Sequence, residues 1–159
     1  MFNNRNLPEP YEPLAIWLVD QWKKIGLNAT VRVLESAAWF NALRTGDFEV
    51  SMDGQCGYIV EPDLDLYKFL SADRTDASYG RYTDRALDAL YDRQARARDV
   101  DERRRLVREF EKRLLDEQAH VIPTLWWHRI VPHHTRVRGF TITPSHFLNG
   151  QLDTIWLAE

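Results

Sequence analysis

The chain has 159 residues, of which 44% are hydrophobic, 12% aromatic and 28% charged. This length accommodates one domain with a real core, and the aromatic content excludes wholesale disorder. The formal net charge is −3, so the chain lacks the overall basic surface that general nucleic-acid binding requires. A single cysteine, Cys56, excludes an internal disulfide and any zinc site built on two or more cysteines of this chain.

Helix and strand patterns alternate in the first half of the chain. Residues 1–6 lack the apolar core of a signal peptide, are typical of an edge strand, and suggest that the N-terminal part of the natural protein lies upstream. Residues 13–24 are predicted to form a helix whose apolar side chains repeat on one buried face: Leu14, Trp17, Leu18, Trp22 and Ile25. Residues 28–35 and 48–52 alternate as strands, and the helix between them is expected to start at a Ser36 N-cap.

The second half is predicted to be helical first and extended later. A short helix starts near Pro62, and further helices begin at Thr83 or Asp84 and at Asp99 after a polar loop over 71–82. Apolar runs then predict short strands, at residues 121–127 with an extension over 129–131, at 137–143 and at 155–157. This order favours an α/β or α+β fold with a mixed sheet.

No catalytic motif accompanies these elements, although some residues could support chemistry. The acids Asp53, Glu61, Asp63 and Asp65 cluster near a strand end, where they could bind a cation or act as acid and base. Alternatively, Asp63 caps the following helix and the other acids are solvated. Cys56 is either a nucleophile, if folding brings a base near it, or a small buried residue. The five histidines lack metal-site spacing, so we expect no dedicated metal site.

The end of the strand predicted at 48–52 is the most promising binding position, because ligands in open α/β sheets sit beyond the carboxyl ends of strands. The residues that follow it combine an open backbone with an amide, a thiol and a phenol: Gly54, Gln55, Cys56, Gly57 and Tyr58. Trp126 and Trp127 end another predicted strand. Each either packs in the interior or faces the cleft, and strand alternation allows only one to face it.

Several stretches in this order and spacing resemble one family. They are residues 18–27 with 31–33, 46–50 with 54–63, 79–90, and 121–126 with 137–140. Together they resemble the C-terminal part of the extracytoplasmic solute-binding proteins of the peptide, oligopeptide and nickel class, family 5, which feed ABC importers.

The resemblance implies an α/β fold that is part of the second lobe of a two-lobed periplasmic-binding-protein-like architecture, with a mixed sheet flanked by helices. It implies that residues 1–128 belong to the ligand-binding lobe and that residues 129–159 cross back to the first lobe. It also implies a periplasmic protein that uses no cofactor and no covalent chemistry. Its partners would be a small peptide-like or other polar solute and a membrane permease.

Residues 54–58 match the family's ligand-contacting segment, G-W-x-A-D-Y in peptide-binding members. Gln55 stands at the position of the Trp, and Tyr58 stands at the position of the Asp that holds a peptide α-ammonium. The resemblance therefore implies a hydrogen-bonding, partly aromatic cleft wall without the charged partner of a free peptide amine. A hydrolytic enzyme that uses Asp53, Glu61 and Asp63 or Cys56 remains an alternative, as does a protein interaction domain that uses exposed aromatic side chains. The chain itself is expected to self-associate.

Overall fold

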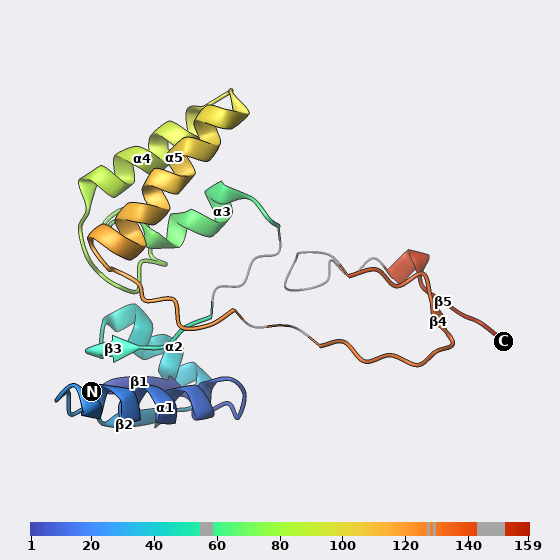
Figure 1. Ribbon diagram of the computed structural model, residues 1–159, viewed down its shortest axis with the longest axis horizontal. Helices are drawn as coiled ribbons and strands as arrows, with labels where there is room; N and C mark the ends of the chain where they lie inside the picture. The colour runs from blue at the N-terminus through green and yellow to red at the C-terminus, as the bar shows by residue number, and fades with distance from the viewer. Residues whose placement is uncertain (55–58, 127, 129, 143–151) are drawn as a thin grey trace.

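A computed structural model describes residues 1–54, 59–126, 128, 130–142 and 152–159. The structure has two layers and an extended C-terminal arm, which is described over residues 125, 126, 128, 130–142 and 152–159 (Figure 1). Within the described residues, no helix is long and apolar enough to cross a membrane.

The first layer is a small parallel sheet with two helices. Strands β1 (Phe2–Arg5), β2 (Val31–Leu34) and β3 (Val50–Ser51) pair in the order β2-β1-β3. Phe2 lies opposite both Val31 and Val50. Residues 2–5 are therefore the central strand, and the prediction of an edge strand was wrong because β2 and β3 pair on its two sides.

Helices α1 (Tyr11–Lys24) and α2 (Ser36–Thr45) follow β1 and β2. The buried apolar residues of this layer are Phe2, Ala15, Trp39, Ala42 and Leu43. The predicted buried face of α1 is only partly confirmed, because Trp17 and Ile25 are exposed. A sheet of three short strands covers too little of a helix of this length. Ser36 is not the N-cap: Glu35 occupies that position, and the Ser36 hydroxyl accepts a hydrogen bond from Arg5.

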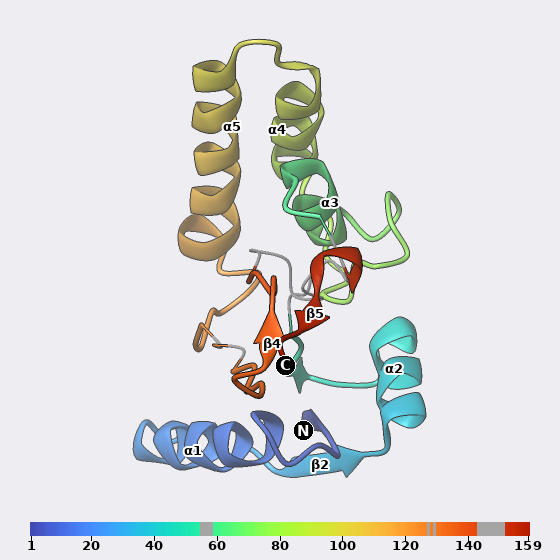
Figure 2. The same ribbon diagram turned by 90° about the vertical axis from the view of Figure 1, so that its right-hand side faces the viewer.

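The second layer is helical. Helix α3 (Pro62–Leu66) continues into a 3₁₀ turn (Tyr67–Phe69), and α4 (Arg85–Arg96) and α5 (Val100–Lys112) run side by side as a helical hairpin (Figure 2). A π-helical turn (Arg113–Glu117) extends α5. The core of this layer is Leu66, Leu70, Leu87, Phe110 and Leu114. The Asp84 and Asp99 N-caps and the predicted apolar stripes of both long helices are confirmed.

The C-terminal arm extends away from both layers (Figure 1). It ends in an antiparallel pair, β4 (Val137–Arg138) and β5 (Trp156–Leu157), with a 3₁₀ turn (Leu152–Thr154) before β5. The strand predicted at 121–127 is absent over the described residues 121–126. Pro123 has no backbone N–H, and Ile122 and Trp126 are exposed, so nothing along this stretch completes a ladder.

Candidate functional site

The carboxyl end of β3 opens into a cavity of about 510 Å³ between the two layers. The sheet layer contributes one side, the segment after α3 contributes another, and residues 119–124 close a third. Its described lining includes residues of both layers and of the connection between α5 and the arm: Phe2, Trp22, Glu49, Ser51, Met52 and Asp53 from the first layer, Lys68, Phe69, Ala77, Tyr79 and Tyr82 from the second, and His120 and Thr124 from the connection. A strand end facing a partly aromatic hollow is a common binding position in α/β proteins.

An ion pair crosses this cavity wall. The Nζ of Lys68 lies 2.9 Å from the Oδ2 of Asp53, and the two side chains are 19% and 28% exposed. The same Nζ lies 5.7 Å from the ring centroid of Phe69 and 5.8 Å from that of Tyr79. A cation at these distances is attracted to the ring faces. The pair joins the end of β3 to the turn after α3.

Tyr82 and His120 form a flat section of the wall. Their rings stack with centroids 3.7 Å apart and an interplanar angle of 4°. The Tyr82 hydroxyl donates a hydrogen bond to the Phe69 carbonyl. Burial, followed by the nearby Asp84 charge, raises the pKa of Tyr82 well above its ordinary value. The phenol therefore stays protonated and keeps donating.

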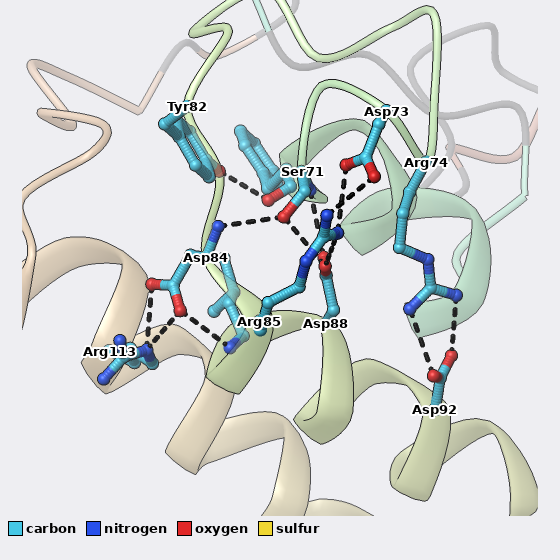
Figure 3. A network of polar contacts seen from close by, with 11 residues as sticks. Ser71, Asp73, Arg74, Tyr82, Asp84, Arg85, Asp88, Asp92 and Arg113 are labelled. Atoms are coloured by element: carbon cyan, nitrogen blue, oxygen red, sulfur yellow. Dashed lines mark hydrogen bonds and ion pairs between the residues drawn. The ribbon is translucent and has the colours of Figure 1, made fainter.

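Two buried aspartates hold the loop behind this wall (Figure 3). Asp88 accepts hydrogen bonds from the backbone N–H and the hydroxyl of Ser71, at 3.0 and 2.8 Å. Asp84 caps α4 through the Leu87 N–H and accepts from the Nε of Arg113 at 2.9 Å. The Ser71 hydroxyl also accepts from the Asp84 backbone N–H. These contacts fix both ends of the loop that carries Tyr79 and Tyr82.

The pKa of Asp84 lies below its ordinary value, although burial alone would raise it. Hydrogen bonds from Arg113, from the Leu87 N–H and from His120 outweigh the burial. The Nε2 of His120 lies 3.2 Å from Asp84 Oδ2. The carboxylate therefore remains ionised and keeps α4, α5 and the cavity wall together at neutral pH.

The predicted acidic cluster is divided between cationic partners. Asp53 pairs with Lys68, whereas Arg103 contacts both Glu61 and Asp63. Glu61 rather than Asp63 is the N-cap of α3, because its side chain accepts from the Asp63 N–H. This arrangement favours a structural role for these carboxylates. Among the described residues, no group of His, Cys, Asp and Glu side chains could hold a metal ion.

The structure describes two of the predicted site residues. Gly54 follows the cavity-lining Asp53, whose Oδ1 accepts from the Gly54 N–H at 2.8 Å. Trp126 is 91% exposed and lies beyond the cavity-lining Thr124. The others lie outside the described residues: Gln55, Cys56, Gly57, Tyr58 and Trp127.

The sequence prediction missed the second-layer wall of the cavity. Lys68 lies within a helical stretch of mostly apolar residues. Its charge among these apolar neighbours was the one feature of the sequence that could have indicated a cavity residue. Tyr79 and Tyr82 lie in a stretch that the resemblance includes, but nothing in that stretch marks them as cavity residues, and only the chain fold brings them to Asp53.

No family profile matches the chain. It superposes on the ABC transporter-associated periplasmic binding protein DppA from Helicobacter pylori, in complex with the peptide STSA, with a TM-score of 0.82 and 22% identity. That match covers 99% of this chain and 31% of DppA. The chain has the fold of part of a periplasmic solute-binding protein. This confirms the fold class and the resemblance expected from the sequence at the level of the fold.

Two further solved structures and one curated sequence are also similar to this chain. HbpA2 from Haemophilus parasuis matches with a TM-score of 0.73 at 22% identity, covering 99% of this chain and 32% of that one. The unliganded open form of the periplasmic murein tripeptide binding protein MppA matches with a TM-score of 0.68 at 20% identity, covering 99% and 30%. The probable deoxycholate-binding periplasmic protein YgiS of Escherichia coli (strain K12) is 28% identical over 116 residues, which are 71% of this chain and 21% of YgiS. The chain thus spans between a fifth and a third of these relatives, of which DppA, MppA and YgiS are named as periplasmic binding proteins.

Proposed function

We propose that this chain forms part of a ligand-binding lobe of an extracytoplasmic solute-binding protein, which captures a solute and delivers it to an ABC permease. The cavity at the carboxyl end of β3 carries the proposal. Its lining includes Asp53, the residue that precedes Gly54, and the sequence pattern predicts ligand contacts from Gly54 onward. The relatives supply the context: DppA is transporter-associated and binds a peptide, and YgiS is named for deoxycholate.

In this proposal, residues 1–128 belong to the lobe and residues 129–159 reach toward a first lobe. The extended course of the described part of the arm, and its exposed Ile130 and Ile142, support that division. Residues 54–58 with Trp126 or Trp127 complete the solute contacts. Solute capture would favour a closed arrangement of two lobes through contacts with both of them.

Calorimetry of the chain against pooled dipeptides, sugars and deoxycholate tests the proposal. We expect weak, saturable binding in which the solute is recovered unchanged, because one lobe offers only part of a cleft. Sub-micromolar binding, worth more than ~8 kcal/mol, would contradict the need for a second lobe. Hydrolysis of the solute would instead support the enzyme alternative.

A matched pair of variants locates the bound solute. Ala77 lines the cavity, so Ala77→Trp should fill the hollow and abolish binding. Ala38 is exposed on α2, so Ala38→Trp adds the same side chain away from the cavity and should bind as the wild type does. Equal binding by both variants would contradict the assignment of the cavity as the solute site.

A further inference from the structure

The cavity contains one strongly basic side chain among its described lining residues, Lys68. Its side chain is 19% exposed, compared with 62% for Lys24, which forms the same type of ion pair with Asp20 on the outer surface of α1. A partly desolvated ammonium is costly unless its donors are used. Lys68 is therefore a specific feature of the wall rather than an ordinary surface lysine.

The Lys68 ammonium, which lines the cavity, has more donors than its ion-pair partner uses. An ammonium group has three N–H donors, and Asp53 is the one hydrogen-bond partner of Lys68 among the contacts of the described residues. The rings of Phe69 and Tyr79 lie within 6 Å of its Nζ and offer flat apolar contact beside the charge. A molecule that lies on these rings would bring an acidic group next to Lys68.

The other ionisable groups that line the cavity leave Lys68 as the side chain that would attract an anion. Glu49 is highly exposed and pairs with the N-terminal ammonium of Met1. His120 faces Asp84 and stacks on Tyr82, whose phenol is protonated and uncharged. Asp53 is the carboxylate that competes with an incoming anion for Lys68.

We propose that Lys68 is a specificity-determining residue that binds the carboxylate or sulfonate of an amphiphilic organic anion, whose apolar body lies against the Phe69 and Tyr79 rings. Asp53 holds the ammonium in place when no solute is bound and gives up part of this contact on binding. The inference rests on the proposed function, since it takes the cavity to be the solute site.

Two fluorescent probes of similar shape test the charge requirement: anilinonaphthalene sulfonate, which is anionic, and phenylnaphthylamine, which is uncharged. Lys68→Met should weaken binding of the anionic probe about tenfold and leave the uncharged probe within about twofold. Asp53→Asn should have the opposite effect and tighten the anionic probe severalfold, because it removes the competing charge. Lys24→Met, which removes the matched exposed lysine, should change neither affinity.

The direction of the Asp53→Asn effect shows whether the Lys68–Asp53 pair recognises the anion or only supports the cavity wall. If Asp53→Asn and Lys68→Met weaken the anionic probe equally, the pair only supports the wall and the inference fails, while calorimetric solute binding can still uphold the proposed function. If the wild type binds neither the probes nor any solute, both fail. Should Lys68→Met lose its native circular dichroism, Lys68→Gln and Asp53→Asn provide the same comparison.

Discussion

Asp84 connects three segments of the helical layer through one buried carboxylate. It caps α4 at the Leu87 N–H, pairs with Arg113 after α5 and contacts His120 in the cavity wall. These donors lower its pKa against the opposing effect of burial. The charge state of this residue therefore affects the whole layer.

We expect acid to destabilise the chain through Asp84. Its folded pKa lies below the ordinary value of 3.8, so the folded state binds fewer protons than the unfolded state in this range. The stabilisation is complete above that ordinary value and is lost as the pH falls through the folded pKa. Asp92 adds to the same loss of stability in acid, because its hydrogen bonds from Arg74 lower its pKa.

Asp84→Asn should reduce the free energy of unfolding at neutral pH by ~2 kcal/mol, since Arg113 loses its nearer charged partner and keeps only Glu117 at 3.8 Å, while the cap is partly kept. It should also flatten the acid limb of the denaturant-unfolding profile. The control is Asp101→Asn, which removes an 86% exposed carboxylate paired with Arg104 and should change little. Parallel pH profiles for wild type and Asp84→Asn would contradict this role.

Tyr58 gives a prediction from the sequence. It stands where peptide-binding members of the resembled family carry Asp, and a phenol offers a desolvated α-ammonium one neutral oxygen. We expect the full-length protein to bind an N-acetylated peptide at least as well as the free amine, and Tyr58→Asp to shift the preference toward the free amine. A wild-type preference of tenfold or more for the free amine (~1.4 kcal/mol) would show that Tyr58 is not the discriminator.

At the scale of elements, the end of α2 depends on Gly46. This residue has φ +75°, and its N–H bonds to the Ala42 carbonyl. A Cβ built at Gly46 would lie 2.6 Å from the Cδ of Arg81, whose guanidinium donates to the Arg44 carbonyl at 2.7 Å. The end of α2 is thus packed against the loop that carries the cavity tyrosines.

Gly46→Ala should destabilise the chain more than Gly26→Ala, measured as free energies of unfolding in denaturant. Both glycines have a left-handed backbone, which costs alanine ~1 kcal/mol. A Cβ at Gly26 meets no atom within 4 Å, whereas at Gly46 it displaces Arg81. We expect an extra cost of ~1 kcal/mol for Gly46→Ala. Equal costs would mean that Arg81 moves aside freely.

The helices and strands also show which parts of the fold could be predicted from the sequence. Helices α4 and α5 were predictable, because their caps and apolar stripes are local and agree with each other. The position of β1 in the sheet was not, because it depends on which strands pair with it. Residues 121–126 have a strand-like composition, but a strand forms only where a neighbour completes its hydrogen bonds.

The candidate site shows the same contrast. The place beyond β3 was predictable from a general property of α/β sheets, and Gly54 lies beside a cavity-lining residue there. The partners of Asp53 and Glu61 were not predictable. Lys68 is 15 residues from Asp53, and Arg103 is 42 residues from Glu61, so only the folded chain brings them together.

At the scale of the whole molecule, the arm extends away from the two layers that form the cavity (Figure 1). Several large apolar side chains of this C-terminal region are exposed: Trp126, Ile130, Ile142, Trp156 and Leu157. Apolar surface of this extent usually finds a partner. In the proposed protein the first lobe would be that partner.

We therefore expect the isolated chain to self-associate through the arm. Its weight-average sedimentation coefficient should rise with concentration, and Trp126→Ser with Trp156→Ser should reduce that rise. Trp17→Ser removes a tryptophan of α1 that is about as exposed as Trp156, 55% against 59%, and should have a smaller effect. A monomer at all concentrations would contradict the expectation.

The central claim is that the cavity between the layers receives a solute. Amide chemical-shift mapping during titration with a solute found by calorimetry tests it most directly. We predict that the largest shifts fall on Asp53, Lys68, Tyr79 and their neighbours, which line the cavity. Saturable binding whose shifts fall on the outer face of α5 or on the arm, with the cavity unperturbed, would contradict the claim.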